Sequence, residues 1–300
     1  MGIQILVGID HESGAIVPLL KRLDFPYAHL EVAHVLSGAD FLAYGVEGYR
    51  SANDVEQVLA QENRHTRQRV ESVARDLSQS GSKKVTAEVL FGHPVEGLLH
   101  RAEALRAELI AVNAAHTKSE GGAVLSGSIA RALLMAAPQS VLIGRPSQLL
   151  KADEQPVRAV FATDHSDYAN RCIEKLIDFG PQGLTHLTLM TAAPEVELEQ
   201  LDRAVPKLGI SISASVRQAL ERRNQALVQK LHKELPKVEI ESVVLPMPIH
   251  EALERAMDRA SADLLILGAK GHSLVERLTL GSVSLRAAMT AAYSVLVLRA

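Results

Sequence analysis

The segment Leu264–Ser284 reads LLILGAKGHSLVERLTLGSVS, and it decides how the chain folds. Its first four residues are aliphatic, which predicts a short buried strand. The glycines that follow, Gly268, Gly271 and Gly281, are typical of a loop, and 282–290 then has the composition of a helix. A strand, a glycine-rich loop and a helix in this order predict an α/β fold built on a parallel sheet.

The same arrangement occurs twice in the chain at a constant spacing. Asp164 lies 154 positions after Asp10, and each aspartate ends an apolar run and is followed by a histidine. Pro248 follows Pro94 at the same distance. Further pairs at this spacing are Gly127 with Gly281, Ser128 with Ser282, Met135 with Met289, and Ser140–Ile143 with Ser294–Val297. A constant offset through a whole half indicates that one domain has been duplicated.

Each half alternates short apolar runs with longer amphipathic stretches, which predicts βαβ units with buried parallel strands. In the first half we predict strands at 4–9, 30–36, 85–91, 109–112 and 141–143, and helices at 14–23, 53–80, 95–107 and 128–136. In the second half we predict strands at 159–162, 186–190, 238–245, 264–267 and 295–298, and helices at 168–179, 211–235, 249–261 and 282–290.

The predicted domains are residues 1–146 and 157–300, and the polar stretch 145–156 is expected to link them. Two long loops, 37–51 and 191–210, are expected after the second strand of each half. Loops of this length are uncommon unless they are functional or mobile. Because the two loops share no sequence, whatever they do is not common to both halves.

The composition excludes several classes of function. A formal net charge of −3 gives no electrostatic footprint for nucleic acid or for an anionic membrane. No stretch approaches the ~18 apolar residues of a membrane-spanning helix, and the apolar run at the N-terminus is too short for a secretion signal. The single cysteine, Cys172, cannot form an internal disulfide, which fits a reducing compartment. We therefore expect a cytoplasmic protein that binds neither nucleic acid nor membrane.

The glycine-rich segment has the chemistry that a phosphate group requires. Glycine permits positive φ and close backbone approach, and the N-terminus of the following helix offers free N–H groups and the positive end of its dipole. Ser282 and Ser284 can supply hydroxyls, and Ser282 can also cap the helix. The segment matches neither G-x-x-x-x-G-K-[ST] nor G-x-G-x-x-G. The alternative is a glycine-rich turn that only connects two elements.

The spacing Gly268-x2-Gly271-x9-Gly281-Ser282, with Asp164 at the end of the first strand of its half, resembles the ATP-binding signature of the universal stress protein family. The resemblance covers both halves, so the chain is similar to the tandem members of that family. It implies two Rossmann-like domains of the adenine nucleotide alpha hydrolase type. Each would be an open five-stranded parallel sheet of order 3-2-1-4-5 with helices on both faces. Asp164 and Gly268 would then flank the switch point at which ligands bind.

The resemblance also implies a role for each residue of the motif. Asp164 would face the adenine and ribose, and Met247 and Pro248 would contribute to the base pocket. Gly268 and Gly271 would let the loop close over the ribose and α-phosphate. The β- and γ-phosphates would be held by Gly281, Ser282, Val283 and Ser284. Lys270, His272 and Arg277 lie inside the loop and can add positive charge. The implied ligand is ATP, with Mg²⁺ as a possible companion. For Asp164 the alternative is an ordinary turn or cap after a strand.

The first half departs from this pattern. Asn113 replaces the first glycine, and asparagine tolerates a left-handed backbone better than most residues. His116 replaces the second, where its ring would obstruct close approach, and the spacer to Gly127 is one residue longer. Asp10 persists. We expect this half to bind no nucleotide, or a different ligand weakly, and to have a regulatory or structural role.

No catalytic signature accompanies the loop. The histidines show no H-E-x-x-H spacing, there is no G-x-S-x-G, and Cys172 is interpreted as a packing residue. Our leading hypothesis is an ATP-binding, nucleotide-responsive stress regulator with at most slow ATP hydrolysis. The alternatives are a nucleotide hydrolase of the adenine nucleotide alpha hydrolase group and a protein that binds another ligand in the same crevice. The last strands of the two halves are expected to pair within the chain, and a homodimer is possible.

Overall fold

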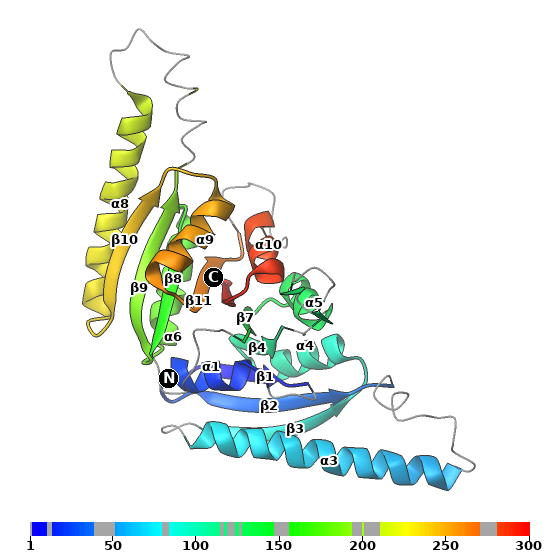
Figure 1. Cartoon of the computed structure of the whole chain (residues 1–300). Coiled ribbons are helices and arrows are strands. Elements are labelled where there is room, and N and C mark those ends of the chain that lie inside the picture. Colours follow the sequence, from blue (N-terminus) through cyan, green and yellow to red (C-terminus); the bar gives the residue numbers. More distant parts are fainter. Residues whose placement is uncertain are drawn as a thin grey trace. The chain divides into compact units, whose positions relative to one another are not determined.

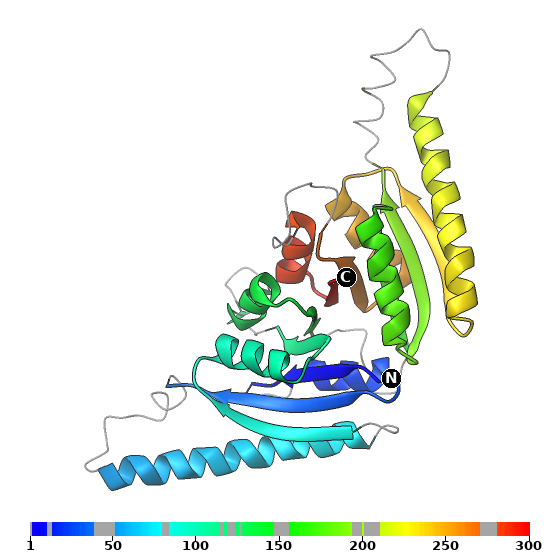
Figure 2. The same ribbon diagram turned by 180° about the vertical axis from the view of Figure 1, so that it is seen from behind.

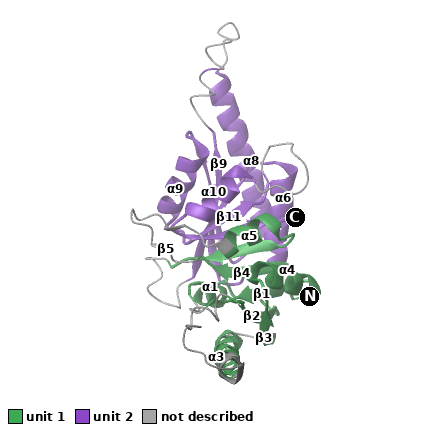
Figure 3. Ribbon diagram, turned by 90° about the vertical axis from the view of Figure 1, so that its right-hand side faces the viewer, with its two compact units in different colours: residues 1–146 green, residues 147–300 purple. Residues whose placement is uncertain are grey.

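The chain is described from a computed structural model (Figure 1). It covers residues 2–10, 14–38, 52–79, 84–114, 117–118, 124–125, 128–146, 156–193, 200, 211–270 and 281–300. The chain divides into two compact units, Met1–Pro146 and Ser147–Ala300, which Figure 3 distinguishes by colour. We describe each unit by itself.

Within the described residues, the first unit contains a five-stranded parallel sheet. Its strands are β1 (Gln4–Gly8), β2 (His29–Leu36), β3 (Lys84–Phe91), β4 (Leu109–Asn113) and β7 (Ser140–Gly144), in the order β3-β2-β1-β4-β7. Its helices are α1 (Ile16–Leu23), α3 (Ala52–Ser78), α4 (Pro94–Ala104) and α5 (Ser128–Ala136). A separate antiparallel ribbon, β5 (Thr117–Lys118) with β6 (Val124–Leu125), lies between β4 and α5 in the chain.

The second unit repeats this architecture over its described part. Its strands are β8 (Val157–Ala162), β9 (Leu184–Ala192), β10 (Glu239–Leu245), β11 (Leu264–Gly268) and β12 (Ser294–Leu298), in the order β10-β9-β8-β11-β12. Its helices are α6 (Asp167–Phe179), α8 (Ile212–Glu234), α9 (Ile249–Ala260) and α10 (Ser282–Thr290).

The apolar content of each strand depends on its position in the sheet. Four of the five residues of the inner strands β4 and β11 are buried, because an inner parallel strand is covered by helices on both faces. The outer strands β3 and β10 are only partly buried, and charged residues such as Glu88 and Glu241 interrupt them. The continuous aliphatic runs that predict strands are therefore those of the sheet centre, and the mixed runs are those of its edge.

The helices of the second unit cover both faces of its sheet. Helix α9 contacts β8 and β9, and α10 contacts β12 and α9, so these two helices share one face. Helix α6 contacts β11 and β12, and α8 contacts β9 and β10. Figure 1 has α9 and α10 in front of this sheet, and the reverse view in Figure 2 brings α6 and α8 to the front. Right-handed crossovers require this division, because the chain winds in opposite directions from β8 and from β11.

The predicted α/β class and the order 3-2-1-4-5 are confirmed in both units. Several details differ from the prediction. The β5–β6 ribbon was not predicted, β9 continues to Ala192, and Arg145, which was expected in the polar linker, is only 1% exposed. Residues 39–51, 147–155, 194–199 and 201–210 lie outside the described part of the chain. Among the helices described, none is long and apolar enough to cross a membrane.

Candidate functional site

The candidate site of the second unit lies where the winding of its sheet reverses. Strand β11 pairs with β8 through Leu264 with Ala159 and Ile266 with Phe161. From β8 the chain continues to β9 on one side, and from β11 it continues to β12 on the other. The carboxyl ends of β8 and β11 therefore flank a topological switch point, where open α/β sheets bind their ligands. Asp164 follows the first of these strands, and Gly268 ends the second.

Gly268 has a packing role that the sequence did not indicate. A Cβ atom at this position would come within 3.2 Å of Cε1 of Tyr168 and 3.3 Å of Sγ of Cys172. Both distances are shorter than ordinary van der Waals contact, so a side chain here would require Tyr168 and Cys172 of α6 to shift. Gly268 is not among the glycines with positive φ in the described residues. Positive φ is therefore not the reason for glycine at this position, and close packing on α6 explains it.

The two ends of the glycine-rich loop meet at the carboxyl end of β11. The backbone N–H of Gly281 donates to the carbonyl of Ala269 at 2.7 Å, and the Ser284 hydroxyl donates to the carbonyl of Gly268 at 2.7 Å. The N–H of Ala269 in turn donates to Leu298 in β12 at 2.8 Å. These bonds hold the first turn of α10 against β11. Residues 271–280, which include Gly271, His272 and Arg277, lie outside the described part of the chain.

The N-terminus of α10 offers backbone donors at this point. Gly281 is the N-cap residue, with φ −62° and ψ 146°, and no side chain caps the helix. The expectation that Ser282 caps α10 is therefore wrong, because Ser282 is already its first helical residue. Ser282 and Val283 are in the first turn, where N–H groups have no partner within the helix. Ser284 is buried, and its hydroxyl proton is committed to Gly268.

Lys270 lies against α6. Its Nζ atom is 5.7 Å from the centre of the Tyr168 ring, and Cζ of Arg171 is 5.5 Å from the same ring. The Tyr168 hydroxyl donates to the carbonyl of Leu298 at 3.4 Å, and burial raises its pKa, so it stays a donor. The face of one aromatic ring thus attracts two cations beside the loop, an arrangement that concentrates positive charge near the switch point.

The Asp164 carboxylate shapes the turn between β8 and α6. Its Oδ1 atom accepts a hydrogen bond from the N–H of Ser166 at 3.0 Å. The Ser166 hydroxyl then accepts from the N–H of Ala169 at 3.1 Å and caps α6. The turn that was the alternative for Asp164 is therefore present. It does not exclude contact with a ligand, because a carboxylate has two oxygens and several acceptor positions.

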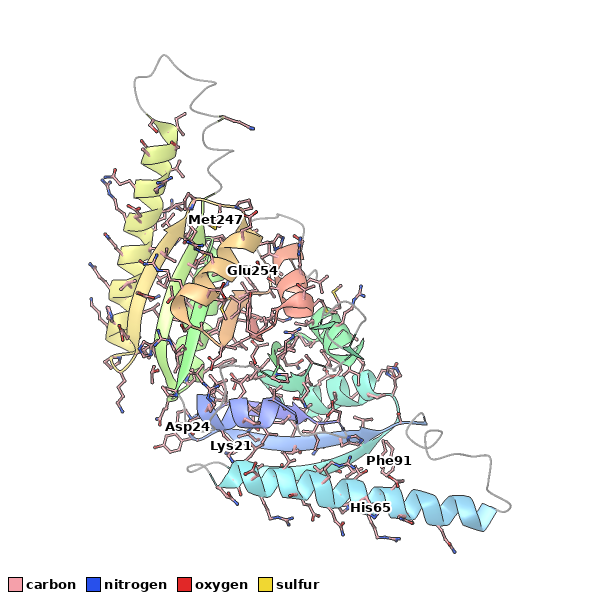
Figure 4. The ribbon with its side chains drawn as sticks, in the orientation of Figure 1. Lys21, Asp24, His65, Phe91, Met247 and Glu254 are labelled. Carbon is pink, nitrogen blue, oxygen red and sulfur yellow. The ribbon has the colours of Figure 1, made fainter. Side chains whose placement is uncertain are left out.

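Met247 and Pro248 connect β10 to α9, as Figure 4 shows for Met247. The N–H of Met247 donates to the carbonyl of Leu245 at 2.9 Å, and Pro248 is the N-cap residue of α9. Strand β10 is separated from β8 by β9. At the usual spacing of neighbouring strands, β10 is therefore about 10 Å from β8. Helix α9, which begins directly after Met247 and Pro248, contacts β8.

A polar cluster at the same edge of the sheet was missed by the sequence reasoning. His165 has a left-handed backbone, with φ 58°, and its Nε2 atom is 3.3 Å from the Thr191 hydroxyl. Thr191 donates to Oδ1 of Asn224 at 3.0 Å, and Nδ2 of Asn224 donates to the carbonyl of Val243 at 3.4 Å. Burial is the main cause that lowers the pKa of His165 below 6.5. The only feature of the sequence that could have indicated this cluster is the histidine that follows Asp164.

The corresponding position of the first unit is organised differently. Oδ1 of Asn113 accepts a hydrogen bond from the N–H of Ile16 at 2.9 Å. Gly14, with φ 50°, lies so close that a Cβ atom there would collide with the Asn113 carboxamide. Asn113 is a strand residue without positive φ, so the interpretation as a left-handed replacement for glycine is wrong. It serves as a cap for the start of α1. His116 and Gly127 lie outside the described residues.

The described residues hold no group of three His, Cys, Asp or Glu side chains that could bind a metal ion. Cys172 is wholly buried, and burial raises the pKa of its thiol to about 12. A thiol with such a pKa is not a nucleophile at neutral pH. Its Sγ lies 3.7 Å from the carbonyl of Leu298, which fits the packing role that we predicted.

Comparisons with known proteins agree with this architecture. The model of the universal stress protein family matches residues 4–145 and 158–299. A universal stress protein from Archaeoglobus fulgidus DSM 4304 is similar over 99% of this chain and 98% of its own, with a TM-score of 0.64 and 15% identity. A protein of unknown function from Pseudomonas aeruginosa PAO1 covers 99% of this chain and 92% of its own, with a TM-score of 0.57 and 15% identity.

A further structure, a putative universal stress protein from Pseudomonas aeruginosa UCBPP-PA14, covers 99% of this chain and 93% of its own, with a TM-score of 0.56 and 14% identity. A comparison with curated proteins finds no match. At these identities the solved structures show the shared fold, whereas the family model matches the sequence of both halves. The chain therefore belongs to the universal stress protein family and carries two domains of that family in tandem.

Proposed function

We propose that the second domain binds ATP at the carboxyl ends of β8 and β11, and that the protein is a nucleotide-responsive stress regulator. The observation that carries the proposal is the hydrogen bond from Gly281 to Ala269, which holds the N-terminus of α10 at the switch point. A helix N-terminus in this place suits the phosphates of a nucleotide, because its free N–H groups and its dipole favour negative charge. Lys270 adds a cation nearby.

The residues of this edge fit the parts of a nucleotide in a definite order. Ser282 and Val283 would hold the β- and γ-phosphates through backbone N–H groups, with Gly271 and His272 completing the loop. Ser284 would act indirectly, because its buried hydroxyl fixes α10 to Gly268. Asp164 would face the ribose and base, and would accept hydrogen bonds from them at lone pairs of its carboxylate that the turn to Ser166 does not use. Any Mg²⁺ would be held mainly by the phosphates, as is usual for this ion.

We propose that the first domain does not bind ATP. Its counterpart of Gly268 is Asn113, whose carboxamide is engaged with the start of α1. The protein would then bind one nucleotide per chain. ATP would act by shifting the population of conformations toward those that bind it best. The two α6 residues against Gly268 are Tyr168 and Cys172, and burial raises the pKa of both, so neither is a general base at neutral pH and we favour a binding role over rapid hydrolysis.

Native mass spectrometry of the freshly purified full chain tests this proposal. We compare the wild type with Gly281→Val, which places a branched side chain at the start of α10, and with Gly127→Val, the same change at the matching position of the first half. We expect one ATP per chain in the wild type and in Gly127→Val, and none in Gly281→Val, with all three folded by circular dichroism. Two ATP per chain would overturn the asymmetry between the domains. Binding of another ligand, or of none, would overturn the assignment of ATP. The same spectra give the oligomeric state.

A further inference from the structure

A chain of four hydrogen-bonded groups runs from the interior of the second domain to the carboxyl edge of its sheet. It begins at the backbone carbonyl of Val243 in β10, passes through the side chains of Asn224 in α8 and Thr191 in β9, and ends at the ring of His165 (elements in Figure 1). Asn224 is 1% exposed and Thr191 is 3% exposed, whereas His165 is half-buried. Burying an amide and a hydroxyl is costly unless each is hydrogen-bonded, so the chain is a built feature of the domain.

The direction of every bond in this chain is fixed by its inner end. A backbone carbonyl can only accept, so the amide nitrogen of Asn224 must face Val243 and its oxygen must face Thr191. That oxygen also only accepts, so the Thr191 hydroxyl gives it its single proton. The Thr191 oxygen can then only accept from His165, which requires a proton on Nε2. The backbone carbonyl of Val243 thereby selects one neutral tautomer of His165, in which Nδ1 carries a lone pair.

The backbone also holds His165 in place at the switch point. It directly follows Asp164, its N–H donates to the Thr163 hydroxyl at 3.1 Å, and its φ of 58° is a conformation that non-glycine residues seldom adopt. Thr191, its ring partner, is the second-last residue of β9. The imidazole therefore belongs to the same edge as the proposed nucleotide site, beside the residue that would face the base.

We propose that His165 is a specificity-determining residue, which recognises an N–H donor at position 6 of a purine base through the lone pair of Nδ1. Among purine nucleotides this chemistry selects the 6-amino group of adenine and rejects the 6-oxo group of guanine. The lone pair of Nδ1 and the 6-oxo oxygen of guanine are both acceptors, so neither would have a hydrogen-bond partner. Loss of such a hydrogen bond discriminates strongly against the wrong base. The inference rests on the proposed function, because it assigns the choice of base within that site.

A purely structural role for these hydrogen bonds makes a different prediction. If they only attached α8 to the sheet, breaking one of them would lower the stability of the domain but would not change its relative affinities for nucleotides. The discriminating measurement is therefore a ratio of affinities. Because the tautomer is set at Val243 and transmitted through Thr191, a change at Thr191 should alter the choice of base even though Thr191 is buried away from the ligand.

Isothermal titration of the full chain with three probes tests this ratio: ATP, GTP and purine riboside triphosphate, which lacks any group at position 6. The variants are His165→Asn, which tolerates the left-handed backbone, and Thr191→Val, which removes the hydroxyl at constant shape. The matched control is Thr188→Val, because Thr188 is also a buried threonine of β9 that donates to a side chain, Glu241, at 2.9 Å.

We expect the wild type and Thr188→Val to prefer ATP over both other probes by about tenfold or more, which corresponds to one hydrogen bond to the base. His165→Asn and Thr191→Val should reduce that preference to about twofold or less while still binding triphosphate. An unchanged preference in both variants would overturn the inference and leave the proposed ATP site standing. Failure of the wild type to bind any of the three probes would overturn both.

The tautomer itself gives a second test that needs no variant. Nitrogen-15 NMR of histidine-labelled wild-type protein distinguishes a protonated Nε2 from a protonated Nδ1. We expect His165 to be protonated at Nε2 without ligand, and we expect the Nδ1 signal to move when ATP is added but not when inorganic triphosphate is added. Protonation at Nδ1, or the same shift with inorganic triphosphate, would overturn the proposal.

Discussion

Oδ1 of Asn113 accepts a hydrogen bond from the backbone N–H of Ile16 at 2.9 Å, although the two residues are 97 positions apart in the sequence. Helix α1 has Ala15 as its N-cap residue and no side-chain cap of its own. The amide at the end of β4 thus does for α1 what Ser166 does for α6. The duplicated domains meet the same need, a partner for the first N–H groups of a helix, with residues from different elements.

Asn113→Ala should therefore weaken the start of α1. Loss of a helix cap costs about 1 kcal/mol, so the free energy for local opening of this region should fall by about that amount. Hydrogen exchange of the α1 amides measures it. Asn113→Asp keeps an acceptor oxygen and serves as the control, with the wild-type exchange rate expected. Equal protection in Asn113→Ala and wild type would contradict the capping role.

Gly268→Ala should destabilise the second domain. The added Cβ atom would lie 3.2 Å from the Tyr168 ring and 3.3 Å from Sγ of Cys172, and overpacking of this kind costs about 1–3 kcal/mol. Urea denaturation measures the change. Cys172→Ala removes one of the two obstacles, so the double variant should lose less than the sum of the two single variants. Strict additivity would show that Gly268 is not held by this contact.

The ion pair between Glu31 and Arg101 should be specific to the first domain. The guanidinium donates to both carboxylate oxygens, with Nη2 to Oε2 at 2.6 Å, and this bond is the main cause that raises the pKa of Arg101. The Glu31 side chain is 8% exposed and that of Arg101 is 33% exposed, so removal of the arginine leaves a buried charge that water reaches only in part. We expect Arg101→Met to cost about 2 kcal/mol after allowance for this partial solvation.

The second domain supplies a matched control for this pair. The repeat places Arg255 opposite Arg101, while the sheet register places Thr188 where the first domain has Glu31. Arg255 is exposed, and Thr188 bonds to Glu241 instead. Arg255→Met should therefore change the free energy of unfolding by less than about 0.5 kcal/mol. A similar loss in both variants would mean that the paired carboxylate is not what makes Arg101 important.

The sequence was sufficient to predict the fold because its evidence is local and repeated. The runs at 5–7 and 159–161 are apolar and buried throughout, as inner parallel strands require, and the constant spacing of 154 between the halves supports each assignment with its counterpart in the other half. The β5–β6 ribbon has only two residues in each strand, too few for any alternation of apolar and polar residues to be recognised. The order of strands followed from the family resemblance and not from the pattern.

The finer features of the candidate site could not be predicted for a physical reason. The partners of His165 are brought together from Thr191, Asn224 and Val243, and the partner of Asn113 lies in α1. These residues are far apart in the sequence and meet only in the folded sheet, so their spacing in the sequence could not predict the contacts. Gly268 illustrates the same limit, since its identity pointed to backbone freedom whereas its neighbours Tyr168 and Cys172 give the actual constraint.

Cys172 should be unreactive in the folded protein. It is wholly buried, and the pKa of its thiol is about 12, so almost no thiolate is present at neutral pH. We expect no reaction with an aromatic disulfide reagent under native conditions, and one thiol per chain after denaturation in guanidinium chloride. Mass spectrometry of the labelled chain measures both. Rapid labelling of the native protein would contradict the burial of this side chain and the packing of α6 on β11.

The stability of the second domain should depend on pH through His165. Burial lowers the pKa of this ring below 6.5, and the charge of Arg223 adds to the effect, while Asn224 and Asp164 act in the opposite direction. The unfolded chain therefore binds a proton at a higher pH than the folded domain does, so the folded domain loses stability as the pH falls from 6.5 through the lowered pKa. Above 6.5 the ring is neutral in both states, and its contribution is constant. We expect the free energy of unfolding of the wild type to fall more between about pH 7 and about pH 5 than that of His165→Asn. Parallel curves for the two proteins would show that His165 titrates as an exposed histidine does, and would remove the reason to regard it as neutral at the switch point.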